Sequence, residues 1–192
     1  MYDGRLGTND YIELFGEWGG RTMESTKALV HAFAACNNWV SELTKGPEKD
    51  MFQAIAKGKW STAEIISHMT FWDRYILEEM LPKMKQDATI QSVDFEIINT
   101  PASAYARSGV SAKHLIEQKM IMREKLVFAV KQKTEAEFFT NFTLNGEEID
   151  KYSGYPHTLF NYIAAFIWHD NHHKQQIYSF LLHKAGGQIE LS

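Results

Sequence analysis

The sequence lacks the disulfide-forming cysteines that stabilise small secreted proteins and the long apolar segment that anchors a chain in a membrane. It has one cysteine, Cys36, in 192 residues, so no disulfide can form within the chain, and a cytoplasmic location is expected. Cys36 lies in an apolar helical stretch, which favours a small core residue over a nucleophile. We expect no signal peptide, because no basic segment precedes an apolar run at the N-terminus. The longest apolar stretch, residues 159–168, is too short to cross a bilayer, so no membrane partner is expected.

An excess of positive charge is also missing. The formal net charge is −4, whereas proteins that bind duplex nucleic acid usually carry a basic face. Basic residues do crowd one segment: Lys113, Lys119, Arg123, Lys125, Lys131 and Lys133. Glutamates at positions 117, 124 and 135 lie among them, which predicts a solvated face of mixed charge and no nucleic-acid partner.

The composition that remains is that of a folded globular domain. Hydrophobic residues make up 44% and charged residues 23% of the chain, and its length suits a single domain with a sizeable core. We expect one domain over residues 1–192. Residues 1–21 are rich in glycine and predict an irregular lead-in with a helical turn at residues 11–15, and residues 22–186 predict a helical bundle.

Helical periodicity predicts four substantial helices. They are expected over residues 22–44, from residue 61 to a kink or end at Pro82, over 111–134, and from Pro156 to about Lys184. A short helix is expected over residues 48–58, a long connection over 87–110, and a small hairpin around Asn145-Gly146. The predicted fold is all-α, a four-helix bundle with long connections of unequal length.

The second of these helices has the clearest start. Ser61 and Glu64 fit a capping box, in which each side chain satisfies a backbone N–H of the first turn. Trp60 and Ile65 occupy the positions of a hydrophobic staple. Apolar residues then follow at helical spacing, at positions 65, 69, 72 and 76.

Three histidines fall within five positions of the last helix: His169, His172 and His173. His169 and His173 are four residues apart, which puts their β-carbons roughly 6 Å apart on one helix face. Both imidazoles can then reach one ion at about 2.0–2.1 Å. His172 is an alternative second ligand. We favour His169 and His173, because they lie in line with the apolar residues along one face of this last helix.

A third ligand should come from another helix and face the core. His68 meets both conditions, although a half-buried histidine with an ordinary polar partner explains it as well. Three neutral nitrogens leave a divalent ion with its full charge and an open coordination position, as in catalytic zinc sites. Such an ion lowers the pKa of bound water or activates a thiolate.

The two segments that carry these residues resemble the DinB/YfiT-like superfamily. They are KWSTAEIISHMTFWDRYI (59–76) and HTLFNYIAAFIWHDNHHKQQI (157–177). The family pattern has one histidine on the second helix and a His-x3-His on the last, which correspond to His68, His169 and His173. The family often continues with Arg-Gly-Gln, where this chain has Lys174, Gln175 and Gln176.

The resemblance implies a four-helix bundle that binds zinc or nickel and assembles as a homodimer. It further implies a metal-dependent hydrolase acting on a small molecule. Thiol-dependent S-transferases that use bacillithiol-like low-molecular-weight thiols are an alternative, and so is a stress-response bundle that binds a metal or small ligand without turnover.

No catalytic acid or base can be assigned from the sequence. The candidates for a pocket or second coordination shell are Glu64, Trp72, Tyr162, Asp170, His172 and Gln176. Glu64 is already accounted for by the capping box, and Tyr162 by the core. Asp170 is expected either to face solvent or to accept a hydrogen bond behind the metal ligands.

Overall fold

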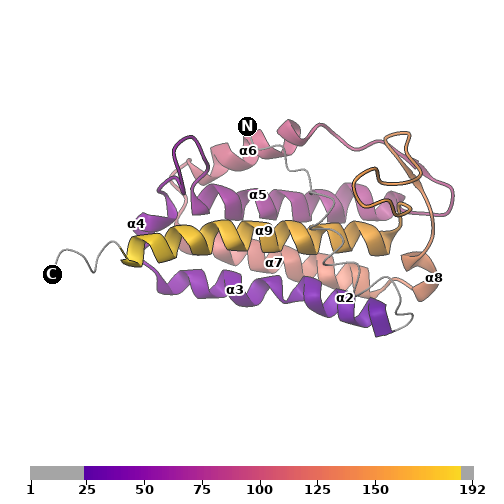
Figure 1. Cartoon of the computed structure of the whole chain (residues 1–192), viewed down its shortest axis with the longest axis horizontal. Coiled ribbons are helices and arrows are strands. Elements are labelled where there is room, and N and C mark those ends of the chain that lie inside the picture. The colour runs from indigo at the N-terminus through magenta and orange to yellow at the C-terminus, as the bar shows by residue number, and fades with distance from the viewer. Residues whose placement is uncertain (1–23, 187–192) are drawn as a thin grey trace.

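The structure is a computed structural model that describes residues 24–186 (Figure 1). The predicted lead-in over residues 1–21 therefore lies outside the described residues. The bundle consists of α2 (Glu24–Ala34) continued by α3 (Cys36–Glu42), α5 (Thr62–Tyr75), α7 (Ala112–Lys131) and α9 (Leu159–Gly186). The shorter elements are η1 (Leu43–Lys45), α4 (Glu48–Met51), η2 (Ile76–Met80), η3 (Leu81–Lys83), β1 (Thr89–Ile90), α6 (Phe95–Ala106), α8 (Glu135–Phe138) and β2 (Thr143–Leu144).

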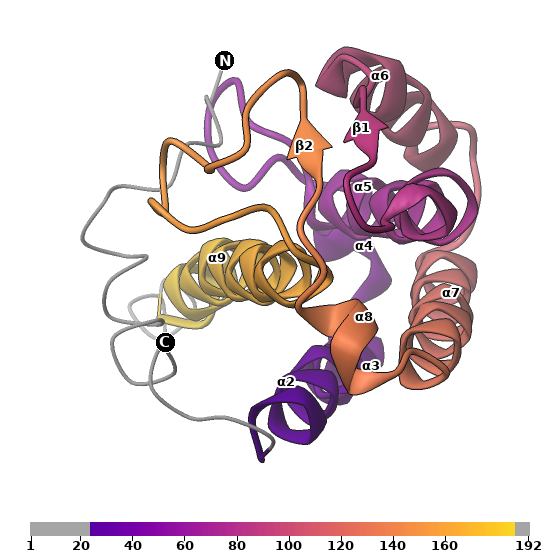
Figure 2. The same cartoon turned by 90° about the vertical axis from the view of Figure 1, so that its right-hand side faces the viewer.

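The four long segments form a closed ring when viewed along the bundle (Figure 2). α5 packs between α7 and α9, and the α2–α3 segment closes the ring on the opposite side. α5 and α7 run in the same direction, while α2, α3 and α9 run the other way (Figure 1). The predicted four-helix bundle is confirmed, with a topology in which α5 is parallel to its neighbour α7, and the α2–α3 segment is parallel to its neighbour α9.

The helix α6 makes this topology possible, because it carries the chain back along the outside of α5 (Figure 1). The sequence predicted only a connection over residues 87–110, and that prediction is wrong for residues 95–106. The Asp94 side chain caps the helix by accepting the Glu96 N–H at 2.9 Å. Ala102, Ser103 and Ala106 are buried against α5. This packing outweighs the helix-breaking tendency of Pro101.

The predicted tight turn at Asn145-Gly146 is confirmed. Both residues have positive φ, 53° and 83°, as a type I′ turn requires. Leu144 and Glu147 exchange both backbone hydrogen bonds at 2.9 Å. The longer pairing is different from the expected hairpin, however, because β2 lies parallel to β1 from the distant α5–α6 connection.

The buried core is divided along the bundle into two apolar clusters. One includes Phe33, Ile76, Leu126 and Ile163, and the other includes Val40, Ile66, Ile116 and Ile177. Between them lies a layer of four charged side chains, which we call the charged layer: Asp73 of α5, Lys119 and Arg123 of α7, and Asp170 of α9. Each is at most 4% exposed.

The charged layer joins the long helices to one another. Asp73 accepts hydrogen bonds from Lys119 Nζ at 2.6 Å and from Arg123 Nη2 at 2.7 Å. Arg123 Nη1 donates to Asp170 Oδ2 at 2.6 Å and to the Phe33 carbonyl of α2 at 2.9 Å. Two carboxylates and two cations balance, so the burial of each charge is compensated.

The location of these residues corrects two expectations. The helix predicted over residues 111–134 is confirmed as α7, and its apolar stripe is buried at helical spacing, at Leu115, Met122 and Leu126. Lys119 and Arg123, expected on a solvated face, are buried instead. Asp170 is also buried, which excludes the first of its two expected positions, the one facing solvent.

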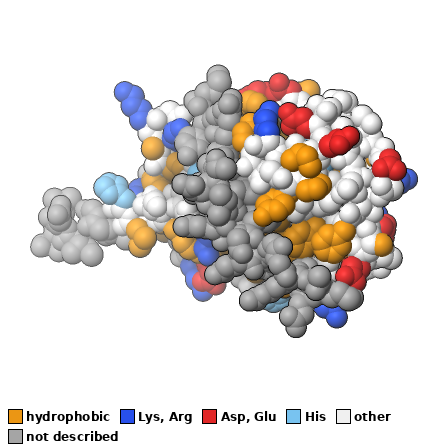
Figure 3. Space-filling model, turned by 45° about the vertical axis from the view of Figure 1, so that its right-hand side comes forward, with side chains coloured by type: hydrophobic (Ala, Val, Ile, Leu, Met, Phe, Trp, Pro, Cys, Tyr) orange, Lys and Arg blue, Asp and Glu red, His pale blue; other side chains and the backbone are white. Residues whose placement is uncertain are grey.

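On the described part of the face in Figure 3, hydrophobic patches lie among acidic and basic side chains. Among residues 24–186, no helix has both the length and the hydropathy needed to cross a membrane.

Candidate metal centre

The start of α5 places His68 in the core. Ser61 accepts the Glu64 N–H at 3.2 Å, and Glu64 Oε2 accepts the Ser61 N–H at 2.9 Å, so the predicted capping box is present. His68 follows one turn after Glu64 and is only 6% exposed. The Trp60 ring packs against it with the ring centroids 5.0 Å apart.

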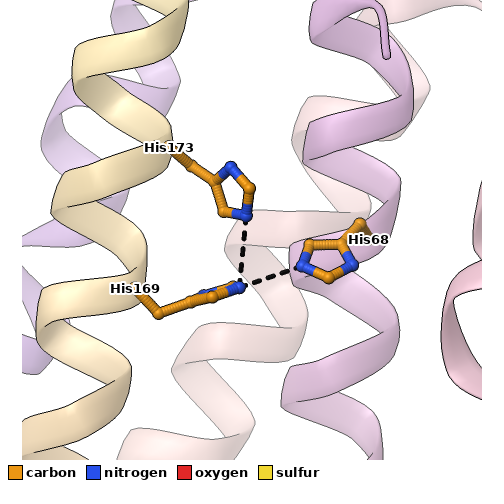
Figure 4. Close-up of side chains that lie close together, drawn as sticks. All are labelled: His68, His169 and His173. Carbon is orange, nitrogen blue, oxygen red and sulfur yellow. Dashed lines mark hydrogen bonds between the residues drawn. The ribbon is translucent and has the colours of Figure 1, made fainter. Parts of the chain in front are cut away.

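His169 and His173 project from successive turns of α9 toward His68 (Figure 4). The His169 Nε2 atom lies 2.9 Å from His68 Nε2 and 3.2 Å from His173 Nε2. The structure thus brings together the three histidines that the sequence favoured. His172 remains outside this group, because its ring stacks on Trp168 and its Nε2 contacts Gln176 Nε2 at 2.9 Å.

These three side chains could hold a metal ion. Tetrahedral coordination at about 2.0–2.1 Å would place two ligand nitrogens about 3.3 Å apart, close to the observed separations of 2.9 and 3.2 Å. A neutral imidazole has one N–H and one lone pair. Three neutral imidazoles that point the same nitrogen toward one place cannot all hydrogen-bond to one another through lone pairs. The same three lone pairs can coordinate a cation, so the arrangement favours a metal ion.

The surroundings keep two of the imidazoles neutral. Burial lowers the pKa of His68 well below its usual value, and repulsion from His169 and His173 adds to this effect. Burial and the charge of His169 likewise lower the pKa of His173 to about 3. Both side chains can therefore offer a lone pair at neutral pH.

Two amide side chains contact the outer nitrogens of these ligands. Asn99 Oδ1 lies 2.8 Å from His68 Nδ1, and Gln176 Oε1 lies 2.8 Å from His173 Nδ1. Trp72 Nε1 donates to the same Asn99 oxygen at 3.1 Å. Asn99 is not among the site residues predicted from the sequence, because residues 87–110 were expected to be a connection. The available signal was Asp94, a helix-capping residue type placed just before a run of apolar residues.

The outer nitrogen of His169 has a different neighbour. Its Nδ1 is buried and has no hydrogen-bond partner, and Asp170 Oδ1 lies 3.6 Å away. Burial opposes ionisation of Asp170, but the Arg123 guanidinium lowers the pKa of this carboxyl below its usual range. A histidine that binds a metal through Nε2 carries its proton on Nδ1. A charged oxygen therefore faces the nitrogen that would hold this proton.

Glu64 and Tyr162 are engaged elsewhere. Although burial acts in the opposite direction, hydrogen bonds from the Ser61 backbone and the Ser103 hydroxyl lower the pKa of Glu64. The Tyr162 ring packs on Phe166 at 5.3 Å, and burial raises the pKa of its hydroxyl. Both residues have structural roles outside the three-histidine cluster.

Cys36 is part of the core, as predicted. It is 5% exposed, and burial raises the pKa of its thiol to about 12, with Asp170 adding to the shift. The thiol therefore stays protonated at neutral pH and does not act as a nucleophile.

Comparison with known proteins agrees with this architecture. Among solved structures, the chain is similar to YfiT from Bacillus subtilis, a protein with an unusual four-helix bundle topology. The TM-score is 0.66 at 10% sequence identity, and the match covers 86% of this chain and 91% of that one. Among curated protein sequences, no match was found. The sequence model of the DinB superfamily matches residues 24–177. This segment is more than half of the chain and includes all three histidines, and the chain belongs to the DinB superfamily.

Proposed function

We propose that this protein is a metal-dependent hydrolase in which His68, His169 and His173 bind one divalent ion, zinc or nickel. The convergence of three Nε2 atoms, with separations of 2.9 and 3.2 Å, carries this proposal. YfiT is itself described as a probable metal-dependent hydrolase. The bound ion would supply a Lewis acid that lowers the pKa of a water molecule or of a substrate thiol.

The residues around the ligands support a small-molecule substrate. Aromatic rings surround the cluster: the Trp72 centroid lies 6.2 Å from that of His68, and the Phe166 centroid lies 5.5 Å from that of His169. Asp170, the nearby carboxylate, forms an ion pair with Arg123 at 2.6 Å. These surroundings favour a substrate with an uncharged, apolar part next to its reacting group. We further propose a homodimer in solution, which sedimentation analysis would test.

Metal analysis of the purified protein tests this function. Untagged protein should contain about one zinc or nickel ion per chain, measured by inductively coupled plasma mass spectrometry. H169A and H173A should each lose it. H172A is the matched control, because His172 lies on the same turn but outside the cluster, and it should retain the ion.

Activity assays then separate the possible chemistries. The metal-loaded protein would be tested with uncharged aryl esters and with low-molecular-weight thiols plus an electrophile. Ester cleavage that is lost in H68A would support the hydrolase, and thiol transfer that is lost in H68A would support a transferase. Absence of metal in the wild type, even after soaking with zinc and nickel, would refute the proposal.

A further inference from the structure

One oxygen atom of α6 contacts two nitrogen-containing rings of α5. Asn99 Oδ1 lies 3.1 Å from Trp72 Nε1 and 2.8 Å from His68 Nδ1. His68 and Trp72 are one helical turn apart on the same face of α5. Asn99 is held in place beside them, because the Ser67 hydroxyl donates to the Ala102 carbonyl of α6 at 2.7 Å.

The chemistry of these three groups leaves one arrangement of hydrogens. An indole N–H can only donate, so the Asn99 atom that faces Trp72 must be the carbonyl oxygen. That oxygen can only accept, so the hydrogen in its contact with His68 must be on Nδ1. A neutral imidazole carries one such hydrogen. The lone pair of His68 is therefore on Nε2, the atom that points toward His169 (Figure 4).

The contact of His173 lacks this constraint. Gln176 Oε1 lies 2.8 Å from His173 Nδ1, but the other end of the amide contacts His172 Nε2. A histidine nitrogen either donates or accepts, so the contact with His172 does not fix which way the Gln176 amide points. A donor-only partner that sets the amide orientation is thus a distinguishing feature of the His68 contact.

We infer that Trp72 and Asn99 together form a positioning device that fixes the tautomer of His68 and presents its Nε2 as a ready metal ligand. This inference rests on the proposed function for its metal-binding consequence. Asn99 acts through His68 and does not touch the ion. α6, which lies outside the ring of four long helices, thereby acquires a role in the site.

Nitrogen-detected NMR of the histidine rings measures the tautomer directly in metal-free protein at neutral pH. The wild type should show His68 protonated at Nδ1. N99A removes the acceptor, and the signal should shift toward a mixture of tautomers. N99D keeps an oxygen acceptor at this position and should restore the Nδ1–H form. T100A changes the neighbouring exposed residue of α6 and should leave His68 unchanged.

Zinc affinity, measured by competition with a chromophoric chelator, gives the second readout. N99A should weaken binding about 10–100-fold, the usual effect of removing a partner of a metal-bound histidine. N99D should bind at least as tightly as the wild type. W72F keeps an aromatic ring but removes the donor that orients the amide, and it should give a smaller loss than N99A. T100A should match the wild type.

The outcomes separate this inference from the proposed function. If the wild type binds no zinc or nickel, the function fails, while NMR still tests the tautomer. If the wild type binds metal and N99A matches it in tautomer and affinity, the inference is wrong. Loss of both readouts in N99D as well as in N99A would also overturn it, because the acceptor would then not be the operative group.

Discussion

Removal of the Arg123 side chain is the sharpest test of the packing between the helices. R123M retains much of the apolar volume but deletes one of the two cations of the charged layer. Arg123 donates two hydrogen bonds to Asp73 and one to Asp170. Asp73 keeps Lys119 at 2.6 Å, whereas Asp170 loses its charged partner while remaining buried.

The expected loss is large. Breaking a buried ion pair by removing one partner costs about 3–5 kcal/mol, a large fraction of the roughly 5–15 kcal/mol that stabilises a typical domain. With a denaturant dependence of about 3 kcal/mol/M, the urea midpoint should fall by roughly 1–2 M. Urea unfolding at pH 7, followed by circular dichroism, measures this shift.

Two further variants test the assigned cause. R123M/D170N removes the isolated carboxylate and should recover part of the lost stability. K83A disrupts the exposed pair of Lys83 and Glu79 and should change the free energy of unfolding by no more than about 1 kcal/mol. A loss in R123M as small as the loss in K83A would refute the buried charged layer.

Two other predictions concern the histidines and the start of α5. In metal-free protein, stability should fall as the pH drops below about 6.5, because the lowered pKa values keep His68 and His173 neutral in the fold while the unfolded chain takes up protons. Each would contribute up to about 1.4 kcal/mol per pH unit, and an unchanged pH dependence in H173A would contradict this reasoning. S61A removes one half of the capping box and should lower the free energy of unfolding by about 1 kcal/mol, measured in urea. S41A is its control, because Ser41 is a partly buried serine in the last turn of α3 whose hydroxyl donates to the Asn38 carbonyl at 2.8 Å and caps no helix start; equal effects would contradict the assigned role.

The sequence predicts those parts of the fold that local patterns encode. The capping box at Ser61 depends on residues three apart, and the stripe of α7 depends on a helical period, so both are visible in the chain itself. The His-x3-His of α9 is local in the same sense. The type I′ turn at Asn145-Gly146 is also local, because positive φ at two consecutive positions selects these residue types.

The parts that the sequence did not predict depend on contacts between distant segments. α6 contains Pro101 and polar residues, and its helical form depends on packing against α5. Lys and Arg are residue types typical of the exposed face of a helix. The carboxylates of Asp73 and Asp170 are what make the burial of Lys119 and Arg123 favourable. Those partners are 46 to 50 positions away from them in the chain, which no periodicity reveals.

The charged layer and the histidine cluster occupy adjacent levels of the same core. Asp170 directly follows His169, and Asp73 directly follows Trp72, the residue that orients Asn99. The ion pairs of Asp73 and Asp170 with Arg123 therefore fix α5 and α9 relative to α7 immediately beside the three imidazoles. Apolar contacts alone tolerate small shifts of one helix past another, whereas ionic hydrogen bonds of 2.6 to 2.7 Å do not. The charged layer thus fixes the relative position of α5 and α9, the two helices that bring their histidines to one point.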